Sequence, residues 1–105
     1  MNWLMNTSIV PNPGTFEVKE ISPDEAESFV QAGGWQSAIG HQGTADVLTG
    51  LLGVPVPVNR VQATMDKGDQ ALVFKLATRL PEGVVLTANE LSRLAFSFWL
   101  MTRIA

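Results

Sequence analysis

Hydrophobic and polar positions follow two periods along the chain, and one of them is typical of β-strands. Strands are predicted where β-branched and aromatic residues gather or alternate with polar ones, at 3–10, 15–20, 35–39, 71–77 and 96–101. Another strand is predicted from Val58 onward, in which Val61, Ala63 and Met65 alternate with polar residues. A turn at 67–69 follows, so we expect segments 58–65 and 71–77 to form a β-hairpin.

The other period, apolar residues three or four apart, predicts helices with recognisable ends. Ser22-Pro23-Asp24-Glu25 has the order of an N-cap, a first-turn proline and first-turn acids, and Gly33-Gly34 ends that helix. A second helix is predicted to follow residues 40–44, with Ala45, Leu48, Leu51 and Leu52 on its buried face and Gly53 as its end. Thr87-Ala88-Asn89-Glu90 is a capping box that opens a third helix.

The mixture of strands and helices predicts an α/β or α+β fold with a mixed sheet flanked by helices. With 105 residues the chain has the size of one domain, and neither a repeat nor a linker divides it. We therefore expect residues 1–105 to form a single domain.

Composition narrows the classes of function. Charged residues make up 16% of the chain, against about 25% in average proteins, which favours a subunit of an oligomer. The net charge of −3 and the scattered basic residues argue against duplex nucleic acid as a partner. With no cysteine and one histidine, a disulfide framework and the usual zinc site are excluded, so a bound metal would have to be held by carboxylates. Neither a signal peptide nor a membrane span is apparent, so we expect a cytoplasmic protein.

The one histidine, His41, lies between Gly40 and Gly43 at the predicted start of the second helix. The N-terminus of a helix attracts anions, and glycines let a ligand approach the backbone. An imidazolium there would act as a general acid at a scissile phosphate. The alternative is a histidine that only caps the helix or lies exposed at the turn.

Arg79 and Glu82 lie three residues apart at a second polar turn. Arginine matches phosphate geometry, and a glutamate would orient or deprotonate an attacking hydroxyl. The alternative is a surface ion pair of little energetic weight. Arg60 offers another guanidinium, and Thr7 and Ser8 offer hydroxyls at the predicted end of the first strand, although such hydroxyls often bond only the local backbone.

These residues occur in an order and spacing that resemble a known family, the viral ring nucleases, which are small type III anti-CRISPR proteins. The resemblance rests on three motifs: Ile39-Gly40-His41-x-x-Thr44-Ala45, Asn59-Arg60 and Arg79-Leu80-x-Glu82-Gly83. It extends from Asn6 to the last predicted strand, and the motifs are specific as a set.

The resemblance implies a homodimer that binds cyclic tetra-adenylate across its interface. That second messenger activates defence nucleases, and family members cut it without metal into linear di-adenylates with 2′,3′-cyclic phosphate ends. It implies that His41 is the general acid, that Arg79 binds the scissile phosphate, and that Glu82 acts as a base or a positioning group. The ligand-binding residues expected with them are Thr7, Ser8, Gly40, Gly43, Thr44, Arg60 and Thr78. If a virus encodes the protein, its site of action would be the host cytoplasm.

Two other functions fit the same sequence. One is a sponge that sequesters a cyclic oligonucleotide without cutting it. The other is a small interaction protein of a mobile element, in which the Gly-His turn is purely structural.

Overall fold

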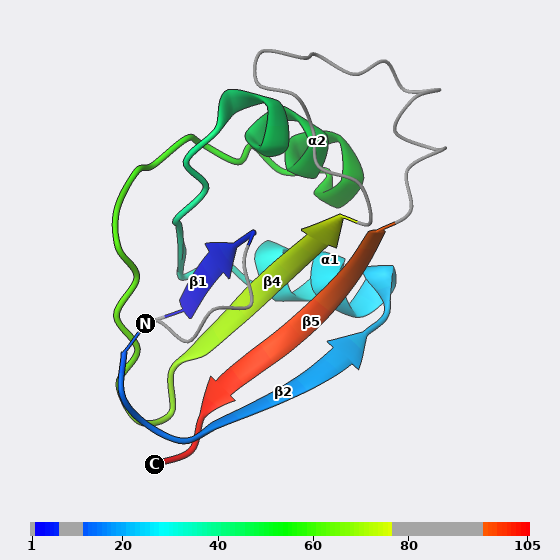
Figure 1. The fold of residues 1–105 in the computed structure, drawn as a ribbon. Coiled ribbons are helices and arrows are strands. Elements are labelled where there is room, and N and C mark those ends of the chain that lie inside the picture. The colour runs from blue at the N-terminus through cyan, green and yellow to red at the C-terminus, as the bar shows by residue number, and fades with distance from the viewer. Residues whose placement is uncertain (1, 7–11, 77–95) are drawn as a thin grey trace.

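The computed structural model describes residues 2–6, 12–76 and 96–105 (Figure 1). Five strands and two helices lie in this part of the chain. They follow one another as β1 (Asn2–Met5), β2 (Phe16–Ile21), α1 (Pro23–Gln31), β3 (Trp35–Ser37), α2 (Gln42–Leu52), β4 (Gln70–Leu76) and β5 (Phe96–Arg103).

The strands form one mixed sheet in the order β2-β5-β4-β1-β3. β1 runs parallel to both of its neighbours, β3 and β4. β5 runs antiparallel to both β4 and β2. The predicted α+β fold with a mixed sheet is therefore confirmed.

Helix α1 begins and ends where its sequence signals lie. The Ser22 hydroxyl accepts a hydrogen bond from the Glu25 amide at 3.1 Å, and the Glu25 carboxylate accepts one from the Ser22 amide at 3.2 Å. This capping box satisfies two backbone donors that the first turn leaves without helical partners. After α1, Gly33 and Gly34 both have φ of +75°, a conformation that favours glycine.

Helix α2 begins after His41 and ends at Gly53. Gly53 has the left-handed backbone (φ 71°), and its amide donates to the Thr49 carbonyl at 3.1 Å. Apolar residues at helical spacing, among them Ala45, Leu48 and Leu52, are buried. The helix predicted to follow residues 40–44 is confirmed, and it already begins within them, at Gln42.

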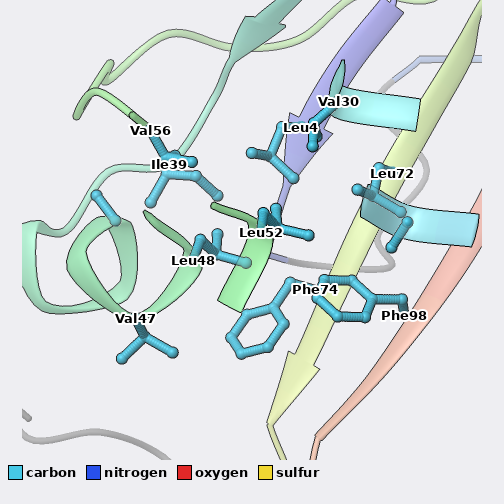
Figure 2. Close-up of a cluster of buried hydrophobic side chains, with 12 residues drawn as sticks. Leu4, Val30, Ile39, Val47, Leu48, Leu52, Val56, Leu72, Phe74 and Phe98 are labelled. Carbon is cyan, nitrogen blue, oxygen red and sulfur yellow. The ribbon is translucent and has the colours of Figure 1, made fainter. Parts of the chain in front are cut away.

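Both helices cover the same face of the sheet (Figure 1). Their buried side chains join those of β1, β4 and β5 in one apolar cluster (Figure 2). Ile39 and Val56, from the segments on either side of α2, belong to the same cluster. Burial of these side chains fixes α2 and its flanking segments on the sheet.

The opposite face of the sheet is covered in part by an irregular segment, residues 61–66, which we call the covering segment. Ala63 and Met65 are buried there against Trp3, Val73 and Met101. Three side chains hold its backbone. Trp3 Nε1 donates to the Thr64 carbonyl at 3.2 Å. The Asn12 amide pairs with both the amide and the carbonyl of Met65, at 2.9 and 3.0 Å. Arg103 Nη1 also donates to the Met65 carbonyl, at 2.6 Å.

The predicted hairpin between 58–65 and 71–77 is wrong, because residues 58–65 form no strand. β4 pairs with β1 on one side and with β5 on the other, so neither of its edges is open to the preceding segment. The apolar alternation at 61–65 reflects packing across a sheet face instead of pairing within the sheet. The turn at 67–69 is present, with the Asp69 amide donating to the Asp66 carbonyl at 3.0 Å.

Of the remaining predicted elements, some are confirmed, one is shorter than predicted, and others lie partly or wholly outside the described residues. The strands predicted at 15–20 and 96–101 are confirmed as β2 and β5, and the one at 35–39 ends at Ser37. The first strand is described only as β1, because residues 7–10 lie outside the described part of the chain. The third helix, predicted to begin at 87, lies outside it too. No helix in the described ranges has the length and hydropathy needed to cross a membrane.

Replacing Asn12 with alanine removes both bonds to Met65 and leaves the Met65 amide without that acceptor. We expect Asn12→Ala to lower the free energy of unfolding by about 1–2 kcal/mol, the usual cost of leaving a part-buried donor unpaired. Urea denaturation followed by tryptophan fluorescence measures this. Gln62→Ala, at an exposed position of the covering segment, is the control and should change the unfolding free energy by less than about 0.5 kcal/mol. Equal stability of the two variants would contradict the role given to Asn12.

Candidate functional site

The parallel strands end together at one edge of the sheet. Leu4 of β1 lies beside Ser37 of β3, and Met5 of β1 lies beside Val73 of β4. Because β1, β3 and β4 run in the same direction, their carboxyl ends face the same side. Ligands of open α/β sheets commonly bind beyond such an edge. The segment after β3, which carries Gly40 and His41, leaves the sheet from this edge.

His41 is the N-cap residue of α2 and is exposed. Its backbone is extended (φ −126°, ψ 133°), and its carbonyl accepts the helical hydrogen bond from Ala45 at 3.0 Å. The side chain does not cap the helix, and the first turn of α2 contains no acidic residue. The positive end of the helix dipole therefore meets no carboxylate in that turn, which favours an anion beside His41.

Two further predicted ligand residues lie in the same turn. Gly43 is half-buried, and Thr44 is buried with 9% of its surface exposed. Gly40, on the other side of His41, is half-buried as well. The structure thus keeps Gly40, His41, Gly43 and Thr44 in one turn, as their sequence proximity predicts.

Arg60 reaches this turn from a distant part of the chain. Its Nε donates to the Gly40 carbonyl at 2.8 Å, twenty residues away in the sequence. The side chain is exposed, and its terminal nitrogens donate to no residue in the described ranges. The guanidinium is thereby tied to the residue before His41. Such a fork of donors is suited to a phosphate.

Arg60 is held in place by contacts that the sequence did not reveal. Asn59 donates from its side chain to the Ser37 carbonyl and from its backbone to the Ile39 carbonyl, both at 2.8 Å. Ser37 is buried, and its hydroxyl donates to the Pro57 carbonyl at 2.6 Å. The partners are about twenty residues apart, so no local pattern signals these bonds.

The other predicted site residues lie outside the described part of the chain. They are Thr7, Ser8, Thr78, Arg79 and Glu82. Within the described ranges, no three or more histidine, cysteine or acidic residues gather as a metal site would require. What the geometry brings together is one histidine, one arginine and the N-terminus of a helix, a set that can bind an anion and offer it a proton.

Solved structures contain a close match to this fold. The chain superposes on B116 of Sulfolobus turreted icosahedral virus with a TM-score of 0.83 and 25% sequence identity. The match covers 97% of this chain and 98% of B116. The topology described above is therefore that of a viral protein of known structure.

Sequence relatives come from viruses and from a bacterium. Protein ORF117 of Acidianus two-tailed virus is 41% identical over 108 residues, which cover 97% of this chain and 92% of ORF117. YddF of Bacillus subtilis is 34% identical over 102 residues, covering 95% of this chain and 94% of YddF. The family model described as STIV B116-like matches residues 2–98. The chain belongs to the STIV B116-like family.

Proposed function

We propose that this protein is a ring nuclease that cleaves cyclic tetra-adenylate without a metal ion and so silences type III CRISPR signalling. The observation that carries the proposal is the 2.8 Å bond from Arg60 Nε to the Gly40 carbonyl. It brings a guanidinium next to the residue that precedes the only histidine of the chain. The motif resemblance supplies the identity of the ligand, and the viral relatives fit an anti-CRISPR role.

The reaction requires few groups from the protein. A ribose 2′-oxygen attacks the neighbouring phosphorus, the bond from phosphorus to the 5′-oxygen breaks, and a 2′,3′-cyclic phosphate remains. The imidazolium of His41 gives its proton to the departing 5′-oxygen, and a base takes the proton of the 2′-hydroxyl. Glu82 is that base or positions the groups involved. The phosphate charge is met by Arg60, Arg79 and the N-terminus of α2.

A homodimer completes the proposal. Cyclic tetra-adenylate has four phosphates and rotational symmetry, and a two-fold dimer would present two copies of His41 to it. Two cuts then yield two di-adenylates. The four arginines contributed by Arg60 and Arg79 of both subunits would match the four phosphates, which agrees with the low overall basicity of the chain. The protein would act in the cytoplasm, where the messenger is made.

The first experiment is incubation of the purified protein with cyclic tetra-adenylate in EDTA, with products identified by liquid chromatography and mass spectrometry. We expect linear di-adenylate with cyclic phosphate ends. Intact ligand together with tight binding would replace the nuclease with a sponge. Intact ligand without binding would remove both functions and leave an interaction protein.

Replacing His41 with alanine removes the proton donor and keeps the backbone of the turn. We expect His41→Ala to lower the single-turnover cleavage rate by about 10²- to 10⁴-fold, the usual contribution of a general acid. The affinity for cyclic tetra-adenylate, measured by isothermal titration calorimetry, should stay within about threefold of the wild type. Gln62→Ala serves as the control. Wild-type cleavage by the His41 variant would exclude His41 as the acid.

Replacing Arg60 with alanine should act on binding. Loss of charge-assisted bonds to a phosphate costs about 1.5–3 kcal/mol, so we expect the dissociation constant to rise by about 10- to 100-fold. The same titration at two salt concentrations gives a second readout, because removal of a phosphate contact reduces the salt dependence of binding. Unchanged affinity at both concentrations would show that Arg60 does not contact the ligand.

A further inference from the structure

We propose that Asn59 is a positioning residue that sets the geometry of His41 relative to Arg60, an inference that rests on the function proposed above. Asn59 is half-buried and lies beside Arg60 in the sequence. The proposed role is to hold the segment that carries Arg60 in a fixed place against the turn that carries His41. It does not require Asn59 to touch the ligand.

The two segments are joined by a series of hydrogen bonds. The Ser37 hydroxyl donates to the Pro57 carbonyl at 2.6 Å, and the Asn59 amide side chain donates to the Ser37 carbonyl at 2.8 Å. The Asn59 backbone amide donates to the Ile39 carbonyl, also at 2.8 Å. The last bond in the series is that of Arg60 Nε to the Gly40 carbonyl. Residues 37–40 and 57–60 are thus bonded at four points.

Hydrophobic burial does not fix residues 57–60 against residues 37–40. Val58 and Val61 are 37% and 45% exposed, whereas Val56 and Ala63 on either side are buried. The stretch between these two buried anchors therefore depends on its hydrogen bonds for its position. Asn59 makes two of the four hydrogen bonds. Of these two, Asn59→Ala removes the bond from the side chain and keeps the bond from the backbone amide.

Residues 37–40, in turn, fix the position of His41. Ile39 is fully buried in the helix-side core, and its amide donates to the Ser37 hydroxyl at 3.2 Å. Gly40, which has no side chain to pack, is the single residue between this anchor and His41. The carbonyl of Gly40 is held by Arg60, and Arg60 is held through its neighbour Asn59. Loss of the Asn59 side chain would therefore loosen both the arginine and the histidine turn.

Proton transfer is sensitive to such loosening. A misplacement of about 1 Å by a residue remote from the chemistry can cost about 100-fold in rate. Binding of an anion depends less steeply on exact position, because Asn59→Ala keeps the Arg60 side chain and its charge, and the attraction between charges falls off gradually with distance. A positioning role for Asn59 thus predicts a loss in the catalytic rate that exceeds the loss in affinity.

The test compares Asn59→Ala with Gln62→Ala, an exposed control three residues further along. We expect Asn59→Ala to lower kcat for cyclic tetra-adenylate by about 10- to 100-fold, with the dissociation constant changed by less than about threefold. A purely structural role would reduce only the thermal stability, and a ligand contact would raise the dissociation constant as Arg60→Ala does. Either of these results would overturn the proposal, as would wild-type kinetics.

A measurement without ligand separates this inference from the proposed function. The chain has one histidine, so its imidazole Cε1–Hε1 pair gives a single NMR cross-peak. We expect Asn59→Ala to shift or broaden this cross-peak in the free protein, and Gln62→Ala to leave it unchanged. If the wild type does not cleave the ligand but the shift is observed, the proposed function fails and the positioning contact stands. An unmoved cross-peak would reject the positioning contact whatever the activity.

Arg60→Lys gives an independent check should Asn59→Ala fold poorly. Lysine keeps the positive charge but lacks the Nε–H that bonds the Gly40 carbonyl. We expect this variant to keep most of the affinity that Arg60→Ala loses and to show the same histidine cross-peak change. A lysine variant with the wild-type cross-peak would show that the Arg60 bond does not position the turn.

Discussion

The central strand β4 is the constraint on which the rest of the molecule depends. Its residues Ala71 to Phe74 are buried on both faces of the sheet, and both of its edges are paired. A strand covered on both faces is built from consecutive apolar residues, as this one is. Because β1 and β3 line up parallel to it, the segments that follow β1 and β3 start from the same edge as its carboxyl end.

The two faces of the sheet are covered by different means. Helices α1 and α2 cover one face through apolar contacts spread over many side chains. The covering segment on the other face buries only Ala63 and Met65 and is fastened by polar side chains from distant residues. This difference explains how an irregular segment keeps a definite place on the sheet. It also makes the second face dependent on a few individual hydrogen bonds.

The sequence predicts structural features well when the residues that determine them lie close together in the chain. Both described helices were predicted closely, because the capping box at Ser22 and the left-handed glycine at 53 act within a few residues. The hairpin at 58–77 was predicted wrongly, because apolar alternation shows which residues are buried but not which strand pairs with which. The neighbour that occupies that edge of β4 is β1, at the other end of the chain.

In the candidate site, too, local features could be predicted from the sequence and long-range contacts could not. The place of His41 at the start of a helix could be predicted from the flanking glycines and the apolar spacing that follows. The contact of Arg60 with Gly40 could not, because it depends on how the extended link after α2 returns to the sheet edge. The motif resemblance associated Arg60 with a ligand but gave no physical reason for its position. The bonds of Asn59 and Ser37 supply that reason.

The anchoring of Arg60 also bears on conformational entropy. An exposed arginine ordinarily samples many rotamers, and immobilising such a side chain on binding costs about 0.5–1.5 kcal/mol. The Nε bond to Gly40 restricts this side chain before any anion arrives, so part of that cost is already met when the protein folds. The folded chain thus holds the Arg60 guanidinium in a preorganised position. An anion of matching shape would bind there with a smaller loss of conformational entropy than at a surface arginine without such a bond.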